Sequence, residues 1–97
     1  MKRLSNKEIL NELSLLNDWV LNDNQITKVY KLNSFMELMS LANLVSDKSE
    51  QIDHHPKMII DFNQIEFLIT THSEGGITSL DFLLASFIEE TYNELFS

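Results

Sequence analysis

The 97-residue chain has no cysteine, one proline, two glycines and few positive charges. Without cysteine it has no disulfide, thiolate nucleophile or cysteine-based metal site, which fits a reducing compartment such as the cytoplasm. Its formal charge of -8, from 15 acidic and 7 basic residues, argues against nucleic acid as a partner, because phosphate binding needs clustered Lys and Arg. No run approaches the roughly 20 apolar residues of a membrane span. The basic start at Lys2 and Arg3 leads into an amphipathic segment rather than a signal peptide.

Length and apolar content predict one small globular domain. A chain of 97 residues leaves no room for a second core, and 43% apolar residues is too many for a disordered chain. We therefore expect residues 1–97 to form a single cytoplasmic domain. At this size roughly 60–65% of the unfolded surface becomes buried, so stability should be modest.

Three segments show the helical period after a matching start signal. Each start pairs a hydroxyl residue with an acid three positions on, the capping-box pattern: Ser5 with Glu8, Ser34 with Glu37, and Thr78 with Asp81. Apolar residues then recur at helical spacing to about Leu16, to about Gln51 or Ile52, and to Leu95. The third segment is apolar on two sides, which suggests a contact between subunits.

Four further runs carry the alternation and β-branched content of strands. They are Trp19–Leu21, Gln25–Leu32, Met58–Phe62 and Gln64–Thr71. Asn22-Asp23-Asn24 separates the first pair, and Asn63, which tolerates the left-handed turn conformation, separates the second. The sequence therefore predicts an α+β fold in the order α-β-β-α-β-β-α. Its four-stranded antiparallel sheet should carry three helices on one face.

The residues suited to chemistry concentrate between Glu50 and Pro56. His54 and His55 stand directly before Pro56, which we expect to end the helix because the residue before a proline avoids the helical region. His72 lies seventeen positions beyond His55, after the last predicted strand. Taken alone, two histidines at a helix exit more often cap carbonyls than catalyse, since isolated motifs are weak. Three imidazoles also suffice for a zinc ion, but adjacent histidines point apart and suit a flat ligand better.

The spacing around this stretch resembles the pterin-4a-carbinolamine dehydratases. The shared pattern is Glu50-x3-His54-His55-Pro56 followed by Phe62, His72 and Asp81, and Asn63, Glu66, Thr70-Thr71, Gly75-Gly76-Ile77-Thr78, Trp19 and Phe35 also agree. The resemblance covers nearly the whole chain and the same order of elements. Lys57, Met58 and Ser73 depart from the residues common in the family, which bears on the preferred pterin more than on the reaction.

This resemblance implies an enzyme that removes water from a 4a-hydroxytetrahydropterin to give a quinonoid dihydropterin. The product would be recycled for an aromatic amino acid hydroxylase. The implied partners are the pterin substrate and further copies of the chain in a homodimer or homotetramer, with no cofactor, metal, nucleic acid or membrane. Animal members also serve as dimerisation cofactors of a homeodomain transcription factor. A non-enzymatic interaction module is therefore the alternative.

The chemistry of this implied reaction leads us to a hypothesis about the roles of individual residues. Imidazole, with an ordinary pKa near 6.5, suits both acid and base work near neutral pH. We expect His54 and His72 to act as acid and base and His55 to orient the pterin. Glu50, one helical turn before His54, is expected to hold its tautomer, and Asp81 is expected either to do the same or only to cap a helix.

Two residues remain as possible supports of this site. Trp19 and Pro56 are candidates for supporting the substrate. For Trp19 a core position is the stronger expectation, because a single tryptophan is more often buried than stacked on a ligand. We expect Phe62 to lie in the core as well.

Overall fold

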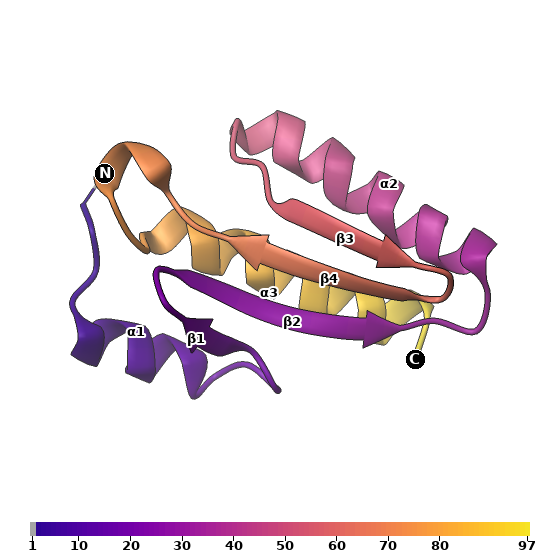
Figure 1. Cartoon of the computed structure of the whole chain (residues 1–97), viewed down its shortest axis with the longest axis horizontal. Helices are drawn as coiled ribbons and strands as arrows, with labels where there is room; N and C mark the ends of the chain where they lie inside the picture. The colour runs from indigo at the N-terminus through magenta and orange to yellow at the C-terminus, as the bar shows by residue number, and fades with distance from the viewer. Residues whose placement is uncertain (1) are drawn as a thin grey trace.

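Three α-helices and a four-stranded sheet form the computed structural model, which describes residues 2–97 (Figure 1). Met1, the first residue of the predicted domain, lies outside the described residues. The elements are α1 (Asn6–Leu13), β1 (Val20–Asn22), β2 (Gln25–Lys31), α2 (Phe35–Ile52), β3 (Lys57–Asp61), β4 (Gln64–Ile69), a 3-10 turn (His72–Glu74) and α3 (Ser79–Leu95). The predicted order α-β-β-α-β-β-α is confirmed.

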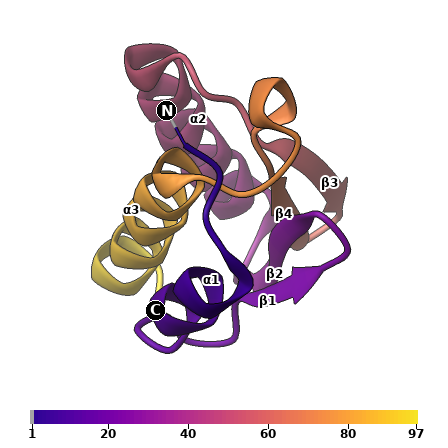
Figure 2. The same cartoon turned by 90° about the vertical axis from the view of Figure 1, so that its left-hand side faces the viewer.

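The sheet is antiparallel throughout and runs in the order β1-β2-β4-β3, so β1 and β3 are its edges. Helices cover one face of the sheet and the other face is open (Figure 2). Residues two apart in a strand point to the same face, so Ile65, Phe67 and Ile69 of β4 are all fully buried. They pack with Leu38 and Val45 of α2, as the alternation predicts.

The helix starts lie at the predicted side-chain caps. Ser5 and Glu8 make both bonds of a capping box at α1, as do Thr78 and Asp81 at α3. Ser34 accepts a hydrogen bond from the Glu37 amide at the start of α2. These bonds satisfy backbone N–H groups that have no partner within a helix, and so fix where each helix begins.

The turn between β3 and β4 differs from the prediction. Phe62, not Asn63, is the residue with positive φ, at 52°, and its side chain is 67% exposed rather than buried in the core. A two-residue connection joins the paired residues Asp61 and Gln64, so Phe62 lies in the tight turn beyond the last pair of the sheet. Asn63 instead donates its side-chain amide to the Leu32 carbonyl at 3.1 Å.

Candidate active site

The end of α2 decides where the two adjacent histidines point. The helix ends at Ile52, near the predicted position, but Pro56 is not what stops it. Asp53 takes a left-handed conformation with φ 51°. Its amide donates to the Glu50 carbonyl and the His54 amide donates to the Ser49 carbonyl, the pair of bonds that defines a Schellman motif. His54 therefore leaves the helix before its side chain can lie above that of Glu50.

The expected pairing of Glu50 with His54 is consequently wrong. Glu50 Oε2 contacts His55 Nε2 at 2.5 Å, and both side chains are exposed, 78% and 54% respectively. His54 instead turns inward, with a side chain only 10% exposed, and its Nε2 lies 2.5 Å from Asp81 Oδ1. Glu50 thus contacts His55, for which no carboxylate partner was predicted, and Asp81 is the carboxylate that contacts His54.

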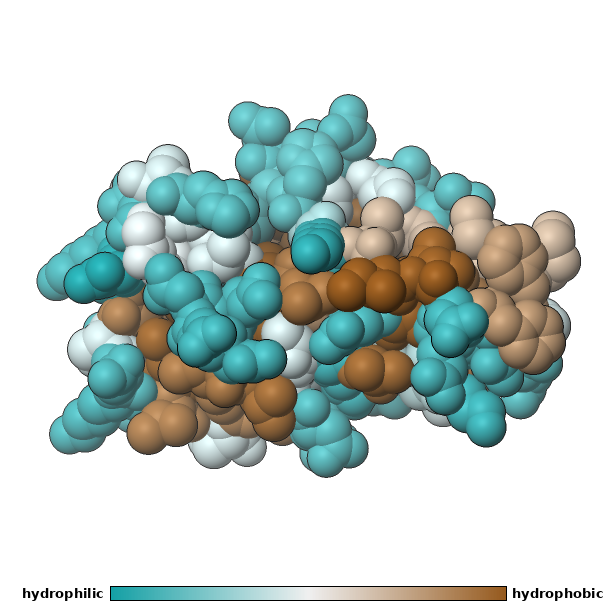
Figure 3. Space-filling view, viewed as in Figure 1, coloured by the Kyte–Doolittle hydropathy of each residue, from teal (hydrophilic) through white to brown (hydrophobic). Residues whose placement is uncertain are grey.

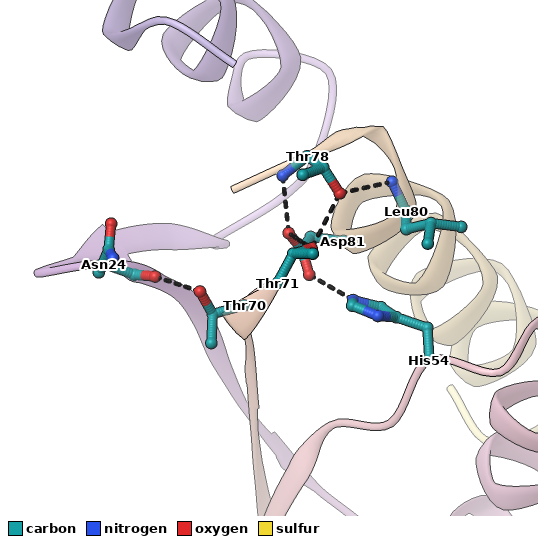
Figure 4. A network of polar contacts seen from close by, with 7 residues as sticks. All are labelled: Asn24, His54, Thr70, Thr71, Thr78, Leu80 and Asp81. Carbon is teal, nitrogen blue, oxygen red and sulfur yellow. Dashed lines mark hydrogen bonds and ion pairs between the residues drawn. The ribbon is translucent and has the colours of Figure 1, made fainter. Parts of the chain in front are cut away.

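Asp81 joins His54 to the start of α3 through the two oxygens of one carboxylate (Figure 4). Its side chain is fully buried. Oδ2 accepts hydrogen bonds from the Thr78 amide and the Thr71 hydroxyl, each at 2.8 Å, while Oδ1 contacts His54. The two roles considered for Asp81, capping and holding an imidazole, are therefore both present. A buried carboxylate needs such partners because leaving it unpaired would cost several kcal/mol.

The pairing with Asp81 assigns the tautomer of His54. A carboxylate only accepts hydrogen bonds, so the Nε2 nitrogen that faces it donates and carries the proton. The remaining nitrogen, Nδ1, is then the one that can exchange a proton with a ligand. The arrangement matches an imidazole oriented by a buried acid, as in other acid–base sites.

His72 lies at the same end of the sheet as the other two histidines. Lys57 of β3 pairs with Leu68 of β4, so the chain entering β3 and the chain leaving β4 are neighbours. His54 and His55 precede β3, and His72 follows β4 in the 3-10 turn. The His72 side chain is exposed and lines a cavity of about 290 Å³. The other residues lining it are Asp23, Asn24, Gln25, Thr70 and Gly75.

Neither His54 nor His55 lines the cavity beside His72. Within one chain, the three imidazoles therefore lie at the same end of the sheet, but they do not all line this cavity.

Pro56 is half-buried in the loop that enters β3. Trp19 lies in the core at 4% exposure, where its Nε1 donates to the Tyr30 hydroxyl at 3.1 Å. Its indole therefore packs in the core, which is the position that we considered more common for a single tryptophan.

A second buried polar cluster was not predicted from the sequence. Glu89 of α3, 8% exposed, accepts hydrogen bonds from Lys28 Nζ at 2.7 Å and from the Tyr30 hydroxyl at 2.5 Å. Burial raises the pKa of Tyr30, and its bond to the Glu89 carboxylate adds to the effect. The signal for this cluster was Lys28, a charged residue on the inward face of β2 that required a partner across the core.

Neither a second cavity nor a group of metal ligands among the described residues adds a candidate site that includes a histidine. A cavity of about 450 Å³ lies between α1 and α3, but its lining, which includes Glu8, Glu12 and Phe82, contains no histidine. Within residues 2–97, no group of three or more His, Cys, Asp or Glu side chains is placed so that it could hold a metal ion. No helix in that range has the length and apolar content to cross a membrane.

Comparisons with known proteins converge on one family. The family model described as pterin 4 alpha carbinolamine dehydratase matches residues 2–91. A protein of Sulfurisphaera tokodaii, provisionally named pterin-4-alpha-carbinolamine dehydratase, is 39% identical over 90 residues, covering 93% of this chain and 97% of its own. A relative from Chloroflexus aurantiacus with the same provisional name is 37% identical over equal shares. The crystal structure of a transcriptional coactivator/pterin dehydratase from Brucella melitensis matches with a TM-score of 0.89 and 28% identity, covering 92% of this chain and 97% of that one.

Proposed function

The chain belongs to the pterin 4 alpha carbinolamine dehydratase family, and from this premise we propose that it removes water from a 4a-hydroxytetrahydropterin. The product is a quinonoid dihydropterin, which a reductase can return to an aromatic amino acid hydroxylase. The observation that carries the proposal is His54, held by the buried Asp81 at the end of the sheet where His55 and His72 also lie.

The reaction needs one acid and one base around a flat ring. The bond between C4a and the hydroxyl oxygen breaks, and the acid supplies the proton with which the oxygen leaves as water. The base removes the proton from the neighbouring ring nitrogen, whose electron pair forms the new C=N bond. Imidazole suits both transfers because its ordinary pKa lies close to neutral pH. The acid can later recover its proton from the base or from solvent, so the site regenerates.

We assign these roles by the surroundings of each imidazole. His54 is fixed by Asp81 through Nε2, which leaves Nδ1 to exchange a proton with the substrate. His72 is the second acid–base group, because it lies at the same end of the sheet with an exposed ring beside a cavity. His55, paired with Glu50 at the surface, orients the pterin. Pro56 shapes the loop that presents both neighbouring histidines.

Turnover of a chemically prepared 4a-hydroxytetrahydropterin tests the assignment. We expect His54→Ala and His72→Ala each to lower kcat by about 10²–10⁴-fold, the usual contribution of general acid–base catalysis. Gln51→Ala, at an exposed position of α2, is the control and should retain the wild-type rate. Unchanged turnover in either histidine variant would refute that residue's role. A wild-type protein without turnover would instead favour the interaction-module alternative.

We also propose that the protein works as a homodimer or homotetramer in the cytoplasm. The support is apolar surface left uncovered on the open face of the sheet, where Figure 3 shows brown residues gathered in a band. Val29 of β2 and Ile59 of β3, which both pair with Glu66 of β4, are 53% and 46% exposed. Exposed apolar residues on both sides of Glu66, together with an unpaired edge strand, are typical of a surface between protein copies.

A further inference from the structure

Thr71 is a buried residue that contacts Asp81, the carboxylate partner of His54. It is the second residue after the end of β4 and is more than nine-tenths buried. Its hydroxyl lies 2.8 Å from Asp81 Oδ2 and 2.8 Å from the Thr78 hydroxyl (Figure 4). It is neither the acid nor the base of the proposed reaction.

The direction of each hydrogen bond around Thr71 follows from counting protons. A hydroxyl has one proton to donate, and the Asp81 carboxylate can only accept. The Thr71 hydroxyl therefore donates its hydrogen bond to Oδ2. The contact between the two hydroxyls must then run from Thr78 to Thr71. The Thr78 oxygen in turn accepts from the Leu80 amide at 3.3 Å. The result is an oriented chain from Leu80 through Thr78 and Thr71 to the carboxylate.

This chain restrains the carboxylate on the side away from the imidazole. Oδ2 is held by Thr71 and by the Thr78 amide, so rotation of the carboxylate would break two hydrogen bonds inside the core. Oδ1 is thereby left facing His54 Nε2. In a low-dielectric interior, successive hydrogen bonds of such a chain polarise one another, which strengthens each of them.

We propose that the Thr71 hydroxyl is a positioning group that fixes the Asp81 carboxylate and, through it, the orientation and tautomer of His54. Thr71 does not touch the substrate. Its effect is to keep the proton on Nε2 of His54, so that Nδ1 is always the nitrogen presented for proton exchange. The kinetic part of this inference rests on the proposed dehydratase function, whereas the tautomer is independent of it.

The test compares Thr71→Val, which replaces the hydroxyl by a methyl group of similar size, with Thr71→Ser, which keeps the hydroxyl. We expect Thr71→Val to lower kcat by about tenfold, the lower range of the effect of outer partners on an oriented histidine. KM should change by less than about twofold, and Thr71→Ser should restore kcat. In ¹H–¹⁵N spectra of the imidazoles, His54 should be the Nε2–H tautomer in wild type and Thr71→Ser and a mixture in Thr71→Val.

Thr27→Val is the matched control, because Thr27 is also a buried threonine in the sheet but lies on β2, outside the chain of bonds. Thermal unfolding reports whether each variant is folded, and Thr71→Ala replaces Thr71→Val if the latter is not. An unchanged tautomer and kcat in the variant without the hydroxyl would overturn the proposal. So would a Thr71→Ser protein as impaired as Thr71→Val. A wild-type protein without turnover refutes only the dehydratase function, since the spectra still decide the role of Thr71.

Discussion

His54 and His55 are adjacent in the chain but differ in burial and in partner. His54 is almost enclosed and faces a carboxylate with no exposure, whereas His55 faces a Glu50 side chain in contact with solvent. Ion pairs screened by solvent contribute little, about 0–1 kcal/mol, while a buried hydrogen-bonded pair fixes geometry strongly. The rigid imidazole suits proton transfer, and the exposed one can adjust to a ligand.

Glu89 provides a prediction about pH. Burial alone would raise its pKa, but the hydrogen bonds from Lys28 and Tyr30 outweigh burial and lower it from 4.5. A carboxyl group with a lowered folded-state pKa stabilises the protein at pH above its unfolded-state value. That contribution is lost as pH falls through the folded-state value. Glu89 should therefore stabilise the fold near neutral pH, and this contribution should decline as pH falls through its lowered folded-state pKa.

The measurement is the free energy of unfolding of wild type and Glu89→Gln between pH 7 and pH 3. We expect the variant to be less stable by about 1–3 kcal/mol at neutral pH, as for other hydrogen bonds to a charged group. The difference should narrow in acid. Glu94→Gln, at an exposed position of the same helix, should differ little from wild type at any pH. A difference that grew in acid would contradict the assigned interaction.

At the scale of elements, the end of α2 determines where His54 and His55 point. Asp53 adopts a left-handed conformation that costs most L residues about 1–2 kcal/mol. Its negative charge also lies at the negative end of the helix dipole. Asp53→Gly should therefore raise the free energy of unfolding by about 0.5–1 kcal/mol, because glycine adopts this conformation without strain.

Asp53→Val is the opposing substitution, since a β-branched residue is poorly tolerated at positive φ. We expect it to lower the free energy of unfolding by about 1–2 kcal/mol in urea titrations. It should also disturb the contact between His54 and Asp81, because His54 directly follows residue 53. If glycine destabilised the protein and valine did not, the left-handed helix end would be wrong.

At the scale of the whole molecule, the proposed oligomer gives a further prediction. Ile59 lies on the edge strand β3 and is 46% exposed, so Ile59→Lys should place a charge in the interface and shift the protein toward monomer. Leu10 is the matched control: it is an aliphatic residue, 62% exposed, on helix α1 rather than on the sheet. Sedimentation velocity of wild type, Ile59→Lys and Leu10→Lys makes the comparison. Dissociation by Leu10→Lys alone would place the interface at α1.

The sequence by itself determined the elements of this fold, because caps and periodicity are local. Ser5, Ser34 and Thr78 fix the helix starts through bonds to residues at most three positions away. The alternation in β4 selects its buried face in the same way. The spacing of the histidines, with Pro56 and Asp81, also indicated the family that the comparisons then showed.

Only the tertiary structure decided which acid serves which histidine. Sequence spacing paired Glu50 with His54 on the assumption that the helix continued, but the left-handed Asp53 breaks that register. The contact from His54 to Asp81 spans 27 residues, and Thr71 joins it only because β4 and the start of α3 meet in the core. Contacts between segments far apart in the chain depend on how the elements pack, and no local pattern of residues specifies that packing.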